Sequence, residues 1–190
     1  MLEKLKESMK KCPVVKFGDY EYFVHPITDG IPLGDPEVLE EVTEAMISIA
    51  DLDCDKIVTA ESMGFPLAAS LSLATGIPYV FIRKRNYGLP GEVSVKQVTG
   101  YSGTDMFINF IEEGDRVIFV DDVLSTGGTL RAVVRALNAV KANLIDVIIV
   151  FNKNPDKARL EKELGTRIKT LLDVRVVDGR VQYHLSQKEA

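Results

Sequence analysis

The chain has 190 residues, about the length of one typical domain. Apolar residues make up 46% and charged residues 27%, a balance that disfavours a disordered, collagen-like or coiled-coil chain. The 23 basic residues against 28 acidic residues give a net charge of −5, which argues against a general nucleic-acid-binding surface, because polyanion binding needs a basic excess. No apolar run approaches the roughly 18 residues of a membrane helix, so we expect no membrane span.

The first third of the chain predicts two helices separated by an extended arm. Leu2, Leu5 and Met9 recur at helical spacing among charged residues, a pattern that lacks the uninterrupted apolar core of a secretory signal. Residues 20–27 predict a strand or extended arm that is closed by turn residues. A helix with Asp35 as its N-cap follows. The apolar face of this helix comprises Val38, Leu39, Val42, Met46 and Ile49.

From residue 56 onward, short apolar strands alternate with helices. The predicted strands are 56–60, 79–82, 116–120 and 146–151, and the predicted helices are 66–75, 130–140 and one that Asn154 and Pro155 open and Gly165 ends. This alternation indicates parallel pairing through right-handed crossovers. The predicted fold is therefore α/β, an open and mostly parallel sheet flanked by helices. Residues 174–177 and 181–185 flank Asp178 and Gly179, which predicts a terminal hairpin.

No internal repeat or low-complexity linker divides the chain, so we expect a single domain over residues 1–190, with an N-terminal arm and hood at about 1–32. One segment breaks the α/β pattern. Residues 83–105 hold four Gly and one Pro, with only weak alternation at Val93, Val95 and Val98. A connection of this length inside a compact domain is typical of a functional flap.

The cysteines and histidines do not have the spacing of metal ligands. Cys12 and Cys54 stand alone and far apart, so neither a disulfide framework nor a zinc site is indicated. His25 and His184 are also far apart in the sequence, and we interpret both as ordinary structural residues. Since no export signal is recognised, the cytoplasm is the expected compartment.

The most informative stretch is residues 117–129, VIFVDDVLSTGGT. An apolar strand runs into Asp121 and Asp122, and in an open α/β sheet ligands bind outside the carboxyl ends of the strands. The turn that follows offers backbone N–H groups and hydroxyls at a helix N-terminus, which suits a phosphate dianion. The residues of this turn are Ser125, Thr126, Gly127, Gly128 and Thr129. A P-loop would need a Lys after the glycines, and a dinucleotide fingerprint would need GxGxxG, so both are disfavoured.

Phosphate-binding amides beside paired carboxylates suit a pentose 5-phosphate, because carboxylates accept hydrogen bonds from vicinal hydroxyls. The alternative is a capped helix after a strand end, with Asp121 and Asp122 merely solvated.

This stretch resembles the ribose-phosphate signature of the type I phosphoribosyltransferases, which transfer a phosphoribosyl group from 5-phosphoribosyl 1-diphosphate (PRPP) to a nitrogenous base. The resemblance extends from Tyr22 to about Phe151, and the phrases YFVHPITDGIP, AESMGFP and RKRNYGLPGE are similar to the archaeal hypoxanthine/guanine group. It implies a purine salvage enzyme that converts hypoxanthine or guanine and PRPP to IMP or GMP and diphosphate. The alternatives are an adenine phosphoribosyltransferase and a PRPP-sensing regulator of the same fold.

Carried over position by position, the resemblance implies roles for two loops. Asp121 and Asp122 bind the ribose hydroxyls and place negative potential near the sugar ring, while residues 125–129 hold the 5-phosphate. Residues 60–64 match the family's diphosphate loop, which often contains a non-proline cis peptide bond. The members of this loop that we assign to substrate binding are Glu61, Ser62, Met63 and Gly64. Adenine-type relatives usually carry Arg at the position of Met63.

The resemblance also implies how the leaving diphosphate is stabilised. Lys84 is assigned a catalytic role there, with Arg83 and Arg85 beside it, whereas the alternative is a solvated basic face. Similar enzymes use such residues commonly across a dimer interface, so a homodimer is expected. Mg²⁺ is the expected cofactor, and because it keeps waters and uses substrate oxygens, no dedicated cage of protein ligands is expected.

On the base side, two positions depart from related enzymes. Adenine-type enzymes carry a Glu near Gly100 or Tyr101, and the better-known hypoxanthine enzymes carry an Asp where this chain has Ser125, so the acceptor of the purine proton is not identified. The arm of residues 22–31 is expected to form a hood, with Phe23 or Ile27 stacking on the base, although such residues are more often core. The expected partners are PRPP and a purine base, without nucleic acid or membrane. A DNA-binding regulator would need a further module, and the segment before the arm is too short for a helix-turn-helix.

Overall fold

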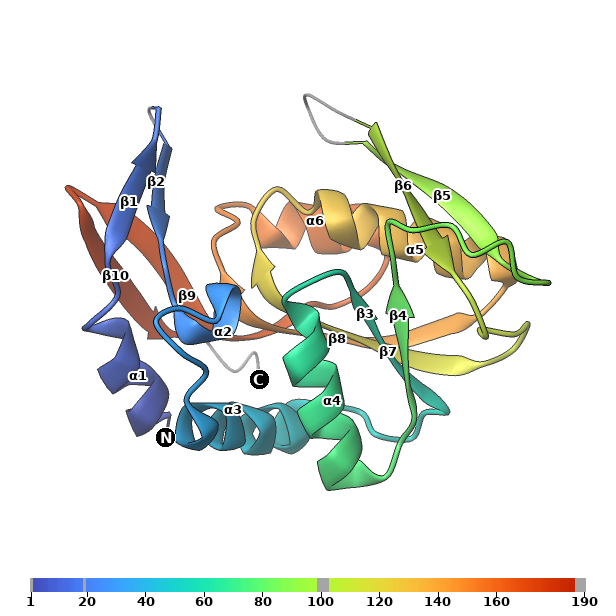
Figure 1. Ribbon diagram of the computed structural model, residues 1–190, viewed down its shortest axis with the longest axis horizontal. Helices are drawn as coiled ribbons and strands as arrows, with labels where there is room; N and C mark the ends of the chain where they lie inside the picture. Colours follow the sequence, from blue (N-terminus) through green and yellow to red (C-terminus); the bar gives the residue numbers. More distant parts are fainter. Residues whose placement is uncertain (1, 19, 99–102, 187–190) are drawn as a thin grey trace.

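The computed structural model describes residues 2–18, 20–98 and 103–186. A six-stranded sheet of order β10-β9-β8-β7-β3-β4 forms its centre (Figure 1). The strands are β3 (Lys56–Ala60), β4 (Tyr79–Ile82), β7 (Arg116–Leu124), β8 (Asn143–Asn152), β9 (Lys169–Val177) and β10 (Arg180–Leu185). All neighbours pair in parallel except β10, which runs antiparallel to β9. The predicted open, mostly parallel α/β sheet is confirmed.

Helices cover both faces of this sheet. In Figure 1, α3 (Pro36–Ile49) and α4 (Gly64–Thr75) lie on one face, and α5 (Gly128–Val140) and α6 (Lys157–Leu164) lie on the other. Alternate residues of the central strands β3, β7 and β8 therefore enter two separate apolar cores. These three strands read as continuous apolar runs because both of their faces are buried. No helix among the residues that the structure describes is long and apolar enough to span a bilayer.

Strand β7 is longer than predicted. The sequence suggested an end at Val120, but the ladder with β8 continues through the pairs Asp121↔Ile149 and Val123↔Phe151. Because the backbone of β8 is available as a partner over this whole length, the two acids belong to the strand rather than to the turn after it.

The N-terminal hood differs from the predicted arm. Helix α1 (Glu3–Met9) precedes an antiparallel hairpin of β1 (Val14–Phe17) and β2 (Tyr20–Phe23), and the short helix α2 (Pro26–Asp29) follows. The strand ends at Phe23 because the His25 ring caps α2, with Nδ1 accepting a hydrogen bond from the Ile27 N–H at 3.0 Å. Strand β1 was not predicted, since four residues are too few to show an alternation.

The segment predicted as a flap contains a second antiparallel hairpin. Strands β5 (Val93–Val98) and β6 (Gly103–Ile108) pair with each other, and the hairpin joins the end of β4 through a bridge between Arg83 and Phe107. Figure 1 shows hairpins β1–β2 and β5–β6 standing apart, on opposite sides of the turns that follow β3 and β7.

Small shifts occur at two helix starts. Helix α4 begins at Gly64 rather than at residue 66. Helix α6 begins after Asp156, whose carboxylate accepts a hydrogen bond from the Arg159 N–H, whereas Asn154 and Pro155 form the turn before it.

His25 is a buried structural residue, as the sequence indicated. Its ring is fully inaccessible, and since Nδ1 accepts from the Ile27 N–H, Nε2 carries the proton and donates to Ser8 Oγ at 2.8 Å. Burial lowers the pKa of His25 to about 4. The neutral ring therefore joins α1 to α2.

We expect this ring to make the fold acid-sensitive. In the unfolded chain a His side chain has a pKa of about 6.5. Between roughly pH 6.5 and pH 4 the unfolded state therefore binds more protons than the folded state, and the free energy of unfolding falls as the pH drops. The full loss, reached below the folded pKa, is about 3 kcal/mol. Urea unfolding at about pH 7.5 and pH 5 measures this loss. The variant His25→Asn should lose this contribution to the pH dependence, whereas His184→Asn, on an exposed ring, should keep it. The raised pKa values of Asp121 and Asp122 act with the opposite sign in both variants, so the comparison isolates His25. Equal acid sensitivity in wild type and His25→Asn would contradict the assignment.

Candidate active site

The two acids of β7, Asp121 and Asp122, lie on a central strand of the sheet, and their side chains face different neighbours. Neighbouring residues of a strand point to opposite faces. Asp121 is 9% exposed, its Oδ1 accepts a hydrogen bond from the Asp122 N–H at 3.0 Å, and the same oxygen lies 3.1 Å from where a Cβ on Gly64 would stand. Asp122 instead interacts electrostatically with Asp29 and Tyr22 of the hood. Asp121 thus faces the loop after β3, and Asp122 faces the hood.

Both carboxyl groups are held where ionisation is costly. Burial raises the pKa of Asp121, and the neighbouring charge of Asp122 raises it further. Burial is also the main cause of the raised pKa of Asp122. Carboxylates in this situation gain from hydrogen-bond donors or a positive charge nearby. The pair is therefore suited to receive hydroxyl groups and a developing cation.

The turn of residues 125–129 has its carbonyl groups already bonded. Asn154 Nδ2 donates to Ser125 O at 2.7 Å, and Arg131 Nη1 donates to Thr126 O at 2.8 Å. Arg131 is itself fixed by a two-pronged ion pair with Glu163, at 2.6 and 2.7 Å. The N-terminus of α5 therefore presents backbone N–H groups, the arrangement that binds phosphate. This geometry supports the predicted phosphate site.

Gly127 is required for the shape of this turn. Its φ of +79° lies in the left-handed region, and a Cβ there would stand 2.6 Å from Leu160 Cδ2 on α6. A side chain would strain the backbone and force the Leu160 side chain to move. The first residue of the predicted Gly127–Gly128 pair must therefore be glycine for steric reasons.

The loop after β3 contains the predicted non-proline cis peptide, between Glu61 and Ser62. Gly64 packs so closely against β3 that a Cβ would lie 1.9 Å from Thr59 Oγ1. The Glu61 carboxylate accepts a hydrogen bond from the Lys84 N–H at 3.0 Å. An anionic acceptor would repel a diphosphate, so Glu61 positions the neighbouring segment, while the amides of residues 62–64 remain the candidates for substrate.

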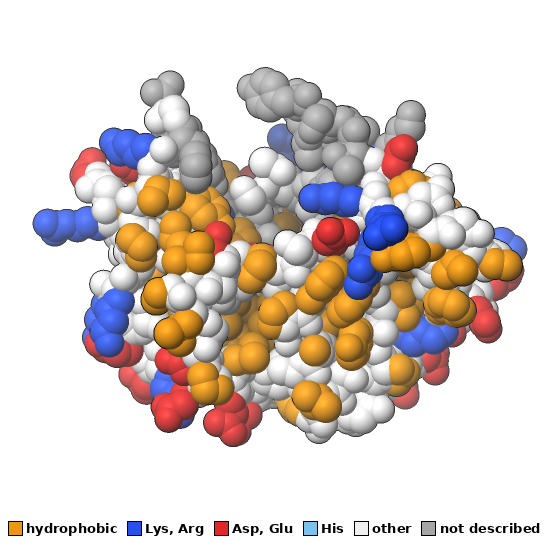
Figure 2. Space-filling model, in the orientation of Figure 1, with side chains coloured by type: hydrophobic (Ala, Val, Ile, Leu, Met, Phe, Trp, Pro, Cys, Tyr) orange, Lys and Arg blue, Asp and Glu red, His pale blue; other side chains and the backbone are white. Residues whose placement is uncertain are grey.

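The basic run after β4 divides into one packed and two exposed cations. The guanidinium of Arg83 lies 5.4 Å from the Phe65 ring centroid and 5.3 Å from that of Phe81. Lys84 and Arg85 are exposed, and Lys84 is adjacent to the loop after β3 through Glu61. Figure 2 shows Lys and Arg side chains gathered near the end of β4, on one margin of a hollow in this face. The structure therefore places the Lys84 backbone next to the loop after β3, and the substrate roles assigned to both stay predictions.

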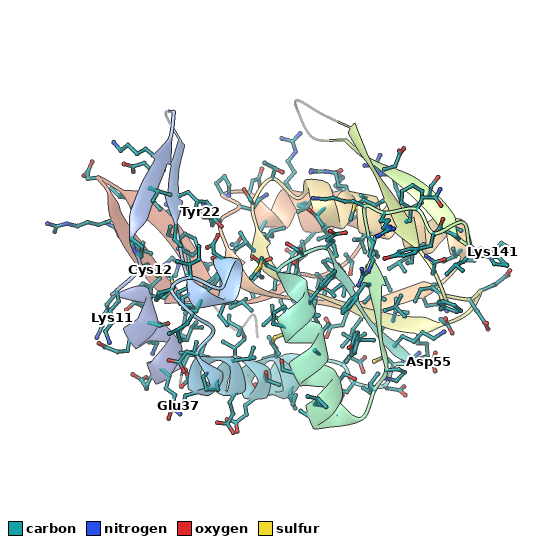
Figure 3. All side chains as sticks on the ribbon, viewed as in Figure 1. Lys11, Cys12, Tyr22, Glu37, Asp55 and Lys141 are labelled. Atoms are coloured by element: carbon teal, nitrogen blue, oxygen red, sulfur yellow. The ribbon has the colours of Figure 1, made fainter. Side chains whose placement is uncertain are left out.

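In the hood, an acid and a phenol lie close to Asp122. Tyr22, labelled in Figure 3, lies on the side of β2 that faces the centre of the molecule. Its hydroxyl donates to Asp29 Oδ1 at 2.9 Å, and the His25 N–H donates to Asp29 Oδ2 at 3.0 Å. Burial, followed by the hydrogen bond to Asp29, raises the pKa of Tyr22, so the phenol stays protonated.

The expectation that Phe23 or Ile27 stacks on a purine is not supported. Phe23 is fully buried and meets Phe151 edge-to-face at 5.5 Å, and Ile27 is 6% exposed within the same core. In this conformation neither side chain offers a face to a ligand, because the hairpin of the hood packs onto β8 and β9. The sequence did not distinguish a core aromatic from a stacking one.

Lys153 is a candidate that sequence reasoning missed. It follows the end of β8, and its Nζ lies 5.3 Å from the Tyr22 ring centroid and 5.2 Å from that of Phe23. The signal was present, because Lys153 comes directly after an apolar strand and so belongs to the same carboxyl edge as Asp121. The flap positions Gly100 and Tyr101 lie outside the described residues.

Comparison with known proteins agrees with this geometry. A model of the phosphoribosyl transferase domain matches residues 33–184. The chain is 50% identical over 189 residues to the hypoxanthine/guanine phosphoribosyltransferase of Methanobacterium lacus, covering 100% of both chains, and 54% identical over 179 residues to that of Methanocaldococcus infernus, covering 94% of this chain and 98% of the relative. Among solved structures, the adenine phosphoribosyltransferase of Thermoanaerobacter pseudethanolicus shares the fold, with a TM-score of 0.73, 23% identity, and coverage of 91% of this chain and 99% of that one.

Proposed function

Because this chain belongs to the phosphoribosyltransferase family, we propose that it is a purine salvage enzyme that converts PRPP and hypoxanthine or guanine to IMP or GMP and diphosphate. The observation that carries the proposal is the meeting of Asp121 and Asp122 with the phosphate turn at one edge of the sheet. The relatives named for this activity cover the full length of the chain and supply the choice of base.

The reaction forms a bond from a purine nitrogen to the anomeric carbon and breaks the bond from that carbon to diphosphate. Positive charge develops on the sugar ring and negative charge on the leaving group, and preorganised groups must meet both. Asp121 and Asp122 hold the ribose and supply negative potential at the ring. Lys84 and the amides of residues 62–64 stabilise the diphosphate, and the turn of residues 125–129 holds the 5-phosphate.

Mg²⁺ is the cofactor we propose for the diphosphate. In the described part of the chain, no three side chains of His, Cys, Asp or Glu gather into a metal cage. The oxygens present fit a metal that binds mainly through substrate and water, as Mg²⁺ does. Asp121 and Asp122 would supply protein carboxylates to the ion, and their raised pKa values would fall beside a cation. When bound, the ion neutralises charge on the leaving group.

Lys153 supports an oxopurine rather than adenine. Its ammonium group only donates hydrogen bonds. Hypoxanthine and guanine carry a carbonyl at C6 that accepts such a bond, whereas adenine carries an amino group there that cannot accept it. Lys153 lies over Tyr22 at the hood, and we propose that its ammonium group donates to the C6 carbonyl of the base.

We also propose a homodimer that pairs through the free edge at β4. This strand forms one edge of the sheet, and its Tyr79 side chain is 42% exposed. The ring centroids of Tyr79 and Phe81 lie 4.9 Å apart, and Phe81 stacks on Phe65 with a centroid distance of 3.9 Å. An aromatic edge strand is a natural site for a second copy. Such pairing would place the basic run of each subunit next to its partner. The two cysteines are free, which is consistent with the cytoplasmic compartment that we propose.

The first test compares hypoxanthine, guanine and adenine as acceptors with PRPP and Mg²⁺ in a spectrophotometric assay. We expect kcat/KM for at least one oxopurine to exceed that for adenine by about 100-fold or more, since a site built around a hydrogen bond rejects the wrong partner strongly. Lys153→Met should remove most of this preference, while Lys141→Met, at the far end of the molecule, should keep it (Figure 3). Faster turnover of adenine than of both oxopurines would refute the choice of base.

The second test separates chemistry from stability at Asp122. We expect Asp122→Asn to lower kcat by about 100-fold, the scale seen for loss of one electrostatic group in an active site. The melting temperature should stay equal or rise slightly, because burial already disfavours this charge. Calorimetry and steady-state kinetics measure the two quantities. An unchanged kcat would contradict the role of Asp122 at the ring.

The third test concerns the assembly. Sedimentation equilibrium at micromolar concentration should find a dimer, and Tyr79→Glu should shift it toward monomer, because a charge at the paired edge would be desolvated without a partner. Leu33→Glu, at a 63% exposed side chain on the hood side, should leave the dimer intact. A wild-type monomer at every concentration would exclude the interface.

A further inference from the structure

Glu92 connects three parts of the flap region through one carboxylate. It directly precedes β5, and Asn109, which directly follows β6, donates from Nδ2 to Glu92 Oε2 at 2.9 Å. The same oxygen accepts the Tyr87 N–H at 3.1 Å, and Oε1 accepts the Gly88 N–H at 3.1 Å. Glu92 therefore ties the loop between β4 and β5 to the root of hairpin β5–β6.

A second carboxylate holds the other end of the same loop. The Glu61 carboxylate accepts a hydrogen bond from the Lys84 N–H at 3.0 Å. The segment from Lys84 to Gly88 is therefore held at both ends through backbone N–H groups, by Glu61 at one end and by Glu92 at the other. In the described part of the chain, no ion pair occupies the side chains of Lys84 or Arg85. The backbone is thus anchored while two cationic side chains stay available.

Tyr87 connects Glu92 to the side chains of Arg83 and Arg85. Its hydroxyl accepts a hydrogen bond from Arg83 Nη1 at 3.2 Å, and the Arg85 guanidinium lies 5.5 Å from its ring centroid. Since the Tyr87 backbone is held by Glu92, the ring that both arginines contact is held as well. A shift of this ring would change the contacts of Arg83 and Arg85.

Both oxygens of the Glu92 carboxylate are occupied by hydrogen bonds from this region. The hydrogen bond from Asn109, with those from the amides of Tyr87 and Gly88, lowers the pKa of Glu92, so the group stays ionised at neutral pH. Charge-assisted hydrogen bonds of this kind are stronger than neutral ones. An acceptor with its oxygens so occupied cannot bind a diphosphate itself.

We propose that Glu92 is a positioning residue, which sets where Lys84 and Arg85 meet the diphosphate of the donor substrate. The proposal rests on the proposed function, because it assumes that this basic run binds the diphosphate of PRPP. Glu92 itself touches no substrate, and its influence passes through the backbone of residues 84–88. A loss of Glu92 should therefore affect PRPP and diphosphate far more than the purine.

The test compares Glu92→Gln and Glu92→Ala with the wild-type protein. Glu92→Gln should raise KM for PRPP and the Kd for diphosphate with Mg²⁺ by about tenfold, the scale of one lost charge-assisted hydrogen bond, and Glu92→Ala should raise both further. KM for the purine should stay within about twofold, and the melting temperature within a few degrees. Glu44→Gln, on an exposed position of α3, makes the same charge change and should alter none of these quantities.

A charge swap at the root of the hairpin adds an independent readout. Asn109→Asp places a second carboxylate beside Glu92, so it should raise KM for PRPP as Glu92→Gln does. The double variant Glu92→Gln with Asn109→Asp should not recover the affinity, because a Gln amide N–H that donates to the introduced carboxylate would face the Tyr87 N–H, which needs an acceptor. An unchanged KM for PRPP in Asn109→Asp would overturn the link to the hairpin.

Two outcomes would overturn the proposal itself. One is an unchanged KM for PRPP and an unchanged Kd for diphosphate in both Glu92 variants. The other is an equal loss toward PRPP and purine together with a lowered melting temperature, which a merely structural residue would produce. Calorimetric binding of diphosphate needs no turnover, so it tests Glu92 even if no purine reacts, a result that would refute only the proposed function. A wild-type protein that binds neither PRPP nor diphosphate would refute both.

Discussion

The parallel pairing of β7 with both of its neighbours is the constraint on which the site depends. Because β3 and β8 bond to β7 from either side, the strand lies in the middle of the sheet, and its ladder with β8 extends through Asp121 and beyond. Asp121 is thereby buried and Asp122 partly buried, and burial raises the pKa of both carboxyl groups. The free-energy cost of this arrangement is offset by the apolar cores on both faces of the sheet.

A common device surrounds these acids: loops are held through their backbone so that other groups remain available for a ligand. The phosphate turn is held by its carbonyl groups, through Asn154 and Arg131, and presents N–H groups at a helix start. The basic segment is held by its N–H groups, through Glu61 and Glu92, and presents cationic side chains. In the basic segment the anchors are the carboxylates Glu61 and Glu92, whose oxygens are occupied by backbone N–H groups.

The fold and the proposed choice of base rest on different features of this molecule. The chain shares its fold with the adenine phosphoribosyltransferase of Thermoanaerobacter pseudethanolicus, at 23% identity. The choice of base that we propose would instead depend on a few side chains at the hood and at the end of β8, chiefly Tyr22, Asp29 and Lys153. A shared backbone therefore says little about the purine, because donors and acceptors at its ring edge are set by side chains rather than by topology.

Local patterns in the sequence were enough to determine the α/β class, most strand positions, and the acids, hydroxyls and glycines of the ribose-phosphate turn. Apolar runs, helix caps and glycines act over a few residues, so they can be read along the chain. The tertiary structure alone decided where β7 ends, because that depends on the length of β8. It also decided that Phe23 is core rather than a stacking face, that Lys153 lies over Tyr22, and that Glu61 and Glu92 grip a backbone. Most of these depend on contacts between segments far apart in the chain, and a sequence pattern does not encode which distant partner a side chain will meet. Glu92 instead contacts the nearby amides of Tyr87 and Gly88, in a loop that has no regular pattern to show it.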